Sequence, residues 1–330
     1  MREFFVKANT FIEKMMVVIM PVAVIAGFLL GDRISSMKDT TTWLFAFACF
    51  AGSLSLSVSD IGKAFNLKAL IALIVLGHVV VPAIATLLFR IVENPSSDFF
   101  IGLMLIFTGP CATTSCIWSG IFGGNKGLSV LFVLVDTLLC MLIMPMLIKL
   151  TCSTDVAMNL GGMVISMLKM VALPSAIGIA VSTIVGKERL SVVSPYLRFI
   201  TKISLLFIIM VGIAGSQAAI KHGFSSSYIW SFILIAVVVV LGYLIGYLSN
   251  KYVLRDELQN GISLAFGLGC RNIGLAIILA NSYFPPLAVV APVVALFYHD
   301  IITSGAGKVF QKILDKKESS NAASRDCEIQ

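Results

Sequence analysis

Charge is scarce in this sequence. Only 12% of its 330 residues are Asp, Glu, Lys or Arg, whereas 58% are hydrophobic, and the mean hydropathy is +0.99. A soluble domain of ordinary composition has about a quarter of its residues charged, so this composition excludes that class. The basic residues stand between apolar runs and form no patch or stripe, which argues against a nucleic-acid-binding protein.

The sequence also lacks the patterns typical of metal sites, disulfide-linked domains and catalytic centres. Its seven cysteines show neither paired metal-type spacing nor a disulfide framework, and it contains only three histidines. There is no His-Glu-x-x-His zinc motif and no Gly-x-Ser-x-Gly nucleophile elbow. We therefore predict a protein without metal or cofactor that is not an enzyme.

Apolar windows of about 20 residues, the length that crosses a bilayer as a helix, fill most of the chain. They predict ten membrane spans, at residues 11–31, 42–58, 67–92, 98–122, 126–150, 166–186, 200–220, 227–249, 258–283 and 286–307. Lys and Arg number 17 on the side of the two termini and 6 on the other, and Arg271 lies within a span. The positive-inside rule then predicts a multi-pass protein of the cell membrane with both termini in the cytoplasm.

Ten spans divide into two halves of five, residues 1–150 and 151–307. An odd number of spans per half makes the halves inverted relative to each other in the bilayer. The predicted fold is therefore an all-α membrane protein built from two inverted five-helix repeats. The remaining residues, 308–330, are rich in Lys, Glu, Ser and Asn, and we expect a disordered cytoplasmic tail.

The fourth span of each half is interrupted by residues that a lipid-facing helix would not tolerate. The interrupting residues are Gly109, Pro110, Gly267, Gly269, Arg271 and Asn272. Broken backbone at membrane depth must be buried in protein or line a wet cavity, because lipid offers it no hydrogen bonds. Paired interruptions in corresponding spans indicate a transporter, and we expect the two breaks to meet at the midplane around a polar binding site.

Five short stretches, in register on the predicted spans, carry a resemblance to a known family. They are Gly52–Asp60, Gly109–Cys116, Gly124–Val130, Gly269–Asn272 and Tyr298–Asp300. Together they resemble the bile acid:sodium symporter family over nearly the whole chain. The resemblance implies a core domain, in which the two broken helices cross, and a panel domain against which the core moves. It also implies organic anion substrates, such as bile acids, pantoate and keto acids, usually carried with two sodium ions.

The first sodium site that the resemblance implies is largely missing from this sequence. Ser115 and Ser129 match coordinating hydroxyl groups of the family. Cys116, Val133 and Gly267, however, stand where the family has an asparagine, a threonine and a glutamate. A thiol, an isopropyl group and a hydrogen atom do not replace the oxygen ligands that a sodium ion needs.

The second implied sodium site departs further from the family. Arg271 stands at the position of the crossover glutamine, and Gly77 and His78 stand near that of a glutamine in the third span. We therefore predict transport that does not depend on sodium; a sodium-coupled organic anion symporter is the alternative. A channel and a transporter-derived sensor are alternatives of another class.

Arg271 has two interpretations. It either satisfies carbonyl groups at the helix break, or its guanidinium group takes the place of a sodium charge and faces an anionic substrate, for which its fork geometry is suited. On the second interpretation the substrate is a small organic anion. The predicted substrate-binding residues are Arg271, Asn272, Thr113, Thr114 and Ser115.

Asp136, His78 and His299 are the candidates for coupling to protons. Asp136 lies near the middle of the fifth span, where it either forms a buried ion pair with Arg271 or is a proton site whose pKa responds to the substrate. His78 and His299 are either packing residues or parts of a proton relay. Transport is accordingly expected to be passive, an exchange, or driven by protons.

Overall fold

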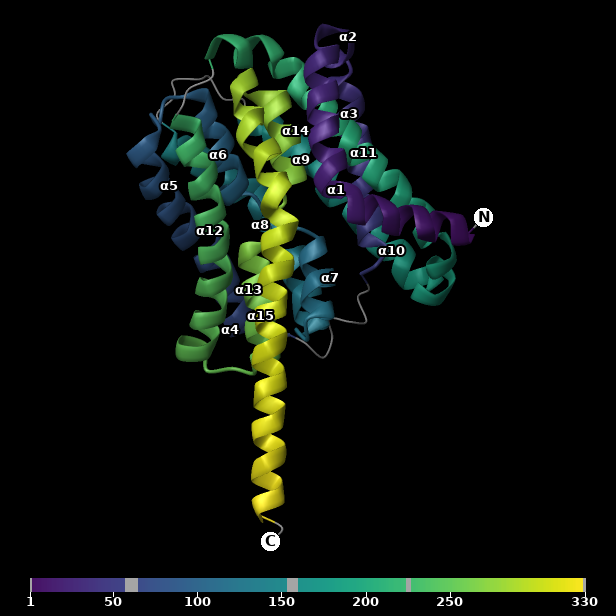
Figure 1. The fold of residues 1–330 in the computed structure, drawn as a ribbon, viewed down its shortest axis with the longest axis vertical. Coiled ribbons are helices and arrows are strands. Elements are labelled where there is room, and N and C mark those ends of the chain that lie inside the picture. The colour runs from purple at the N-terminus through teal and green to yellow at the C-terminus, as the bar shows by residue number, and fades with distance from the viewer. Residues whose placement is uncertain (1, 57–64, 153–159, 224–226, 329–330) are drawn as a thin grey trace.

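The structure is a computed structural model, and it describes residues 2–56, 65–152, 160–223 and 227–328 (Figure 1). These residues form helices and loops, together with one isolated antiparallel bridge between Cys111 and Arg271. The predicted all-α class is therefore confirmed.

The first half of the chain is helical over most of its described residues. They are α1 (Arg2–Leu30), α2 (Asp32–Ser35), α3 (Lys38–Ser53), α4 (Leu67–Val75), the π-helical turn η2 (Leu76–Val80), α5 (Val81–Val92), α6 (Asp98–Thr108), α7 (Thr114–Ile121) and α8 (Lys126–Thr151).

The second half also alternates long and short helices. It consists of α9 (Leu160–Met167), the π turn η3 (Leu168–Ala172), α10 (Leu173–Val185), α11 (Lys187–Gly223), α12 (Ser227–Ser249), the π turn η4 (Asn250–Leu254), α13 (Leu258–Gly269), α14 (Ile273–Tyr283), the 3-10 turn η5 (Pro286–Val289) and α15 (Val290–Glu328).

The helices pack in two groups. Helix α1 lies along α11, and α3 packs against both α10 and α11; we call these four helices the α11 group. Helix α13 packs against α7, α8 and α12, and α12 also contacts α5 and α15; with α4 and α6 these form the α13 group. Figure 1 shows the α11 group on the right and the α13 group at the centre and left. Helix α14 contacts both groups.

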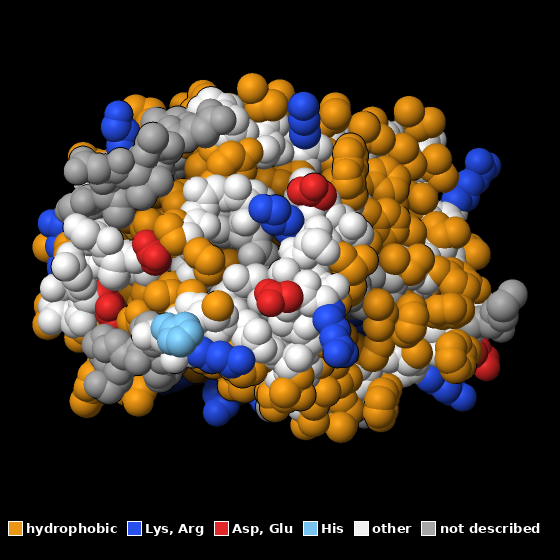
Figure 2. Space-filling view, turned by 90° about the horizontal axis from the view of Figure 1, so that it is seen from above, with side chains coloured by type: hydrophobic (Ala, Val, Ile, Leu, Met, Phe, Trp, Pro, Cys, Tyr) orange, Lys and Arg blue, Asp and Glu red, His pale blue; other side chains and the backbone are white. Residues whose placement is uncertain are grey.

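Six helices among the described residues are long and apolar enough to cross a membrane. The segments are Leu67–Val92, Lys126–Thr151, Gly161–Val185, Glu188–His222, Tyr228–Leu254 and Pro286–Lys317. Large apolar side chains such as Leu87, Leu150 and Ile184 lie exposed on the outside of the bundle. Figure 2, which views the molecule from above, shows hydrophobic side chains around much of its rim and charged side chains across its end. This distribution is that of a protein whose sides are solvated by lipid.

Both predicted helix breaks are present. Helix α6 ends at Thr108, Gly109 has an extended conformation, and α7 begins only at Thr114. In the second break Gly267 is still helical, since α13 continues to Gly269. The second break therefore starts later than predicted, and it ends at Asn272, whose side chain accepts a hydrogen bond from Leu275 N and caps the start of α14.

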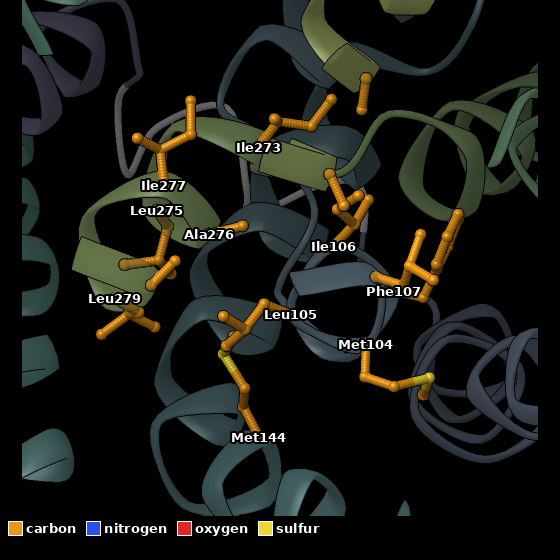
Figure 3. Close-up of a cluster of buried hydrophobic side chains, with 14 of the residues drawn as sticks. Met104, Leu105, Ile106, Phe107, Met144, Ile273, Leu275, Ala276, Ile277 and Leu279 are labelled. Atoms are coloured by element: carbon orange, nitrogen blue, oxygen red, sulfur yellow. The ribbon is translucent and has the colours of Figure 1, made fainter. Parts of the chain in front are cut away.

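Helices α6 and α13, which lead into the two breaks, are surrounded by protein on all sides. Every residue of α6 from Phe99 to Thr108 is buried, as are all residues of α13 from Asn260 onward. Figure 3 shows Leu105 and Ile106 of α6 in one apolar cluster with Met144 of α8 and Ala276 of α14. Helices that are apolar on every side are buried helices. Helices α6 and α13 therefore do not face lipid, whereas α7 leaves Ile117 and Ile121 exposed.

Two helices contain a π turn immediately before a proline. The turn η2 is followed by Pro82, and η3 is followed by Pro174. A proline ring collides with the carbonyl group of the residue four positions earlier, and it has no N–H to donate. That residue is His78 in the first helix and Met170 in the second, and both lie inside the π turn. The wider turn accommodates the ring, and such turns are frequent at functional sites.

The structure has a helix at residues 308–328, where the sequence predicts a disordered cytoplasmic tail. Helix α15 continues to Glu328 and projects from the bundle at the lower end of Figure 1. Phe310 is buried against the bundle, and beyond it Gln311 and Ser319 bond to Asp315. The helix is continuous with a packed transmembrane segment, which provides the nucleus that an isolated polar segment would have to form for itself.

Gly102 and Gly305 are a matched pair for testing the packing of the bundle. A Cβ atom at Gly102 would lie 2.1 Å from the carbonyl oxygen of Ala288, whereas at Gly305 it would meet nothing within 4 Å. Gly102→Ala should reduce the free energy of unfolding by about 1–3 kcal/mol. Gly305→Ala should leave it unchanged or increase it by up to about 1 kcal/mol. Thermal denaturation in detergent measures both, and equal melting temperatures would contradict the packing of α6 against η5.

Candidate functional site

The two helix breaks meet and pair through their backbones. Ala112 N donates to Cys270 O at 2.8 Å, and Asn272 N donates to Pro110 O at 2.9 Å. These bonds flank the antiparallel bridge between Cys111 and Arg271. Each break thus supplies hydrogen bonds to the peptide groups of the other, which lipid could not provide. We call this meeting point the crossing.

Arg271 is buried at the crossing, with only 2% of its surface exposed. Its Nη2 donates to the carbonyl oxygens of Gly77, in η2, and of Phe107, at the end of α6. A side chain at Gly77 would crowd the guanidinium group, since its Cβ would lie 3.4 Å from both terminal nitrogens. Nε and Nη1 of Arg271 have no hydrogen-bond partner among the described residues.

Asp136 of α8 lies fully buried beside the crossing. Its Oδ1 is 2.6 Å from Nε2 of His78, and its Oδ2 accepts a hydrogen bond of 2.6 Å from Cys111 N. The structure therefore pairs Asp136 with His78, and the expected ion pair with Arg271 is not formed. His78 belongs to the π turn η2 of the third span, and its ring reaches from there to Asp136 on α8. Asp136 also holds the backbone of the first break in place.

The predicted substrate-binding residues form two layers at the crossing. Thr113 and Asn272 are half-buried and Thr114 is exposed, whereas Ser115 and Arg271 are buried behind them. The exposed layer faces the α11 group, because a Cβ at Gly52, near the end of α3, would lie 3.6 Å from Thr113 Cγ2. Arg271 therefore stands behind this layer and not on its surface.

The exposed layer keeps polar groups with few partners. Thr113 precedes the first residue of α7 and makes no side-chain capping bond, and the Thr114 hydroxyl lies 3.6 Å from the Cys270 sulfur. The N-terminus of a helix carries partial positive charge and N–H groups that favour anions. The start of α7 thus supplies anion-binding chemistry in front of the Arg271 charge.

Ser129, one of the two hydroxyl residues carried over from the family's sodium site, is engaged elsewhere. Its Oγ donates to Ser119 Oγ at 2.9 Å and lies 3.1 Å from Asn125 O. Ser119 Oγ is in turn 3.1 Å from Ser263 Oγ. The sequence analysis did not identify Ser119 and Ser263 as neighbours of Ser129. Their spacing could have indicated it, because Ser119 lies four residues after Ser115 and Ser263 lies four residues before Gly267, so each shares a helix face with a residue of the implied sodium site.

Apolar packing occupies the positions of the missing sodium ligands. Cys116 and Val133 belong to one buried apolar cluster, with Leu56 and Ile179 from the α3 and α10 side. At Gly267 a Cβ atom would lie 2.7 Å from Leu73 Cδ1 and 3.4 Å from Phe132 Cδ2. A longer side chain at Gly267 therefore has no room in this arrangement.

His299 lies apart from the His78–Asp136 pair. It is buried in α15, and its Nδ1 is 3.3 Å from Oδ1 of the exposed Asp300. No hydrogen bond of the described residues joins His299 to Asp136 or Arg271. Among the described residues no group of three or more His, Cys, Asp and Glu side chains is placed to hold a metal ion.

A sequence model of the Sodium Bile acid symporter family matches residues 42–223, which is more than half of the chain. This chain belongs to that family. The resemblance seen in the sequence is confirmed, although residues 57–60 of the first quoted stretch lie outside the described residues. The family consists of membrane transporters of small molecules and not of enzymes, so the multi-pass class and the transport function follow.

Three relatives illustrate the range of similarity. An uncharacterized protein YbaS of Bacillus subtilis (strain 168) is 30% identical over 88% of this chain and 95% of its own length. An uncharacterized sodium-dependent transporter YocS of the same organism is 27% identical over 69% of each chain. A probable sodium/metabolite cotransporter BASS1, chloroplastic, of Arabidopsis thaliana is 24% identical over 90% of this chain and 74% of its own.

The two partners of Asp136 predict how substitutions at this position affect stability. Asp136→Leu removes the acceptor of Cys111 N and the partner of His78 in a buried site, so we expect a loss of about 3–5 kcal/mol in the free energy of unfolding. Asp136→Asn keeps an acceptor for Cys111 N and should cost only about 1–3 kcal/mol. Thermal stability of the purified proteins measures the difference. The same loss for both variants would mean that the carboxylate does not hold the first break.

Proposed function

We propose that this chain is a sodium-independent carrier of a small organic anion that works by alternating access. Its ten spans then form two inverted halves, the α13 group is the core domain and the α11 group the panel domain. The excess of Lys and Arg on one side supports a cell-membrane protein with both termini in the cytoplasm. The observation that carries the proposal is the buried, permanently charged Arg271 at the crossing.

Sodium independence is supported by the packing at both implied ion sites. Coupling to sodium requires a site of several oxygen atoms that binds the ion and releases it. Cys116 and Val133 pack in an apolar cluster, and the Ser129 hydroxyl is bonded to Ser119. At the second site the guanidinium group of Arg271 already bonds to the Gly77 carbonyl. A covalently fixed cation supplies the charge of a sodium ion but is not transported.

An anionic substrate is supported by the charge and layering of the site. The half-buried Thr113 and Asn272 and the exposed Thr114 are placed to contact a carboxylate at the start of α7. Arg271 lies behind them in a poorly hydrated interior, where its charge is weakly screened. Its two nitrogens without partners leave it capable of further charge-assisted hydrogen bonds.

Proton coupling is supported by a charge balance at the crossing. Arg271 carries one positive charge, and Asp136 neutralises it when neither Asp136 nor His78 holds an extra proton. A substrate carboxylate would then bring an uncompensated negative charge into a buried site, which is costly. One proton taken up by the His78–Asp136 pair restores neutrality. Each carboxylate would therefore enter with one proton, and binding should strengthen as the pH falls.

Uptake by proteoliposomes under imposed gradients tests the coupling. With a panel of organic anions, we expect a proton gradient to stimulate uptake and a sodium gradient to have no effect. Asp136→Asn should abolish the stimulation by protons. Without the Asp136 carboxylate the site has no negative charge that must be neutralised by a proton when the substrate carboxylate enters. Strong stimulation by sodium alone would overturn sodium independence and favour a sodium-coupled symporter. Proton-driven uptake that persists in Asp136→Asn would rule out Asp136 as the proton carrier.

Arg271→Gln and Arg271→Lys separate a charge role from a structural role. Arg271→Gln should weaken binding of the anion by about 1.5–3 kcal/mol, or about ten- to 150-fold, since a charge-assisted contribution is lost. Arg271→Lys keeps the charge but not the fork that reaches the Gly77 and Phe107 carbonyls, so it should retain more affinity than Arg271→Gln at reduced stability. Binding is measured by ligand-induced thermal stabilisation. Equal affinity in the wild type and Arg271→Gln would make the arginine purely structural.

A further inference from the structure

A groove on the outer surface of the bundle lies between the third span and the end of α12. It has a volume of about 280 Å³. One wall is formed by Ile71, Ala72, Val75 and Leu76, and the other by Val253 and Leu254 of η4. Three of these side chains are largely exposed: Ile71 at 52%, Val75 at 47% and Val253 at 76%. In a membrane protein such a surface is in contact with lipid chains.

One end of the groove is basic. Lys68, near the start of α4, lines it directly, and Lys251 and Arg255 lie on and just after η4. All three are exposed. Figure 1 shows α4 and the end of α12 at the end of the bundle from which α15 projects, which is the predicted cytoplasmic side.

These three cations outnumber the two acidic residues that follow Arg255, namely Asp256 and Glu257. In the described part of the chain, no ion pair includes Lys68, Lys251 or Arg255. The Asp256 carboxylate accepts hydrogen bonds from Asn66, Asn260 and Glu257 N and bonds to none of the three cations. The end of the groove therefore has positive charge available for a ligand.

We propose that this groove binds an anionic phospholipid of the leaflet on the side of the two termini. The acyl chain lies against the apolar walls, and the phosphate group contacts Lys68, with Lys251 and Arg255 adding to the positive potential. Basic pockets between transmembrane helices bind anionic headgroups, and lysines at helix ends extend to the interface. A zwitterionic lipid is disfavoured, because it brings its own cation to a site with a net positive charge.

A single turn of helix, η2, separates the groove from the crossing. Leu76 belongs to η2, the turn that also contains Gly77 and His78. A bound acyl chain packs against this turn from outside while the Gly77 carbonyl and the His78 ring hold Arg271 and Asp136 from inside. Lipid binding itself does not depend on the proposed function, and its test requires no transport substrate.

The experiment compares two phospholipids with identical acyl chains, phosphatidylglycerol and phosphatidylcholine, on delipidated full-length protein in detergent. Native mass spectrometry gives the affinity for each lipid. We expect phosphatidylglycerol to bind more tightly, and Lys68→Gln to weaken it about fivefold, the effect of one lysine at an anionic surface, with phosphatidylcholine unchanged. Lys308→Gln, an exposed lysine on α15 at the same end, is the matched control and should bind as the wild type does.

A second pair of variants fills the groove itself. Ala72→Phe and Ser249→Phe, one from each side of the groove, should lower the affinity for both lipids while the melting temperature without lipid reports on folding. Inorganic phosphate should not compete, because it lacks the acyl chain. Equal affinity for the two lipids, equal losses in Lys68→Gln and Lys308→Gln, or full competition by inorganic phosphate would each overturn the proposal.

Discussion

A broken helix inside a membrane needs hydrogen-bond partners for its backbone, and in this protein two breaks provide them for each other. The bonds from Ala112 N to Cys270 O and from Asn272 N to Pro110 O satisfy groups that lipid would leave unpaired. The arrangement requires α6 and α13 to lie inside the bundle, and α6 from Phe99 and α13 from Asn260 are buried throughout. The other helices therefore have to pack around α6 and α13.

The charged residues at the crossing depend on the same arrangement. Arg271 is tolerated in the interior because carbonyl groups of η2 and α6 accept its hydrogen bonds, and because Gly77 leaves space for the guanidinium group. Pro82 widens the helix at His78, which reaches Asp136, and Asp136 holds Cys111 N. A proline in the third span thus influences the geometry of the break in the fourth.

In the proposed mechanism, a fixed arginine replaces the positive charge of a transported sodium ion. Positions that supply oxygen ligands in the family resemblance are filled here by apolar contacts, as for Cys116 and Val133. The space at Gly267 is closed by Leu73 and Phe132. The interior would need a compensating cation for an anionic cargo, and Arg271 is placed where it provides one. The proposed coupling to protons through Asp136 and His78 follows from that fixed charge.

The sequence by itself determined the membrane class, the all-α class, the family and the first break, because these depend on local signals: apolar length, Gly109 and Pro110. It located the second break only roughly, since the start of α14 depends on how the Asn272 side chain bonds.

Only the tertiary structure decided that Asp136 pairs with His78, 58 residues away, and that Ser129 bonds to Ser119. The helical extension of α15 was also missed, because composition does not show that a polar segment continues a packed helix. Contacts between residues distant in the chain depend on how the helices pack, and a local sequence pattern does not contain that information.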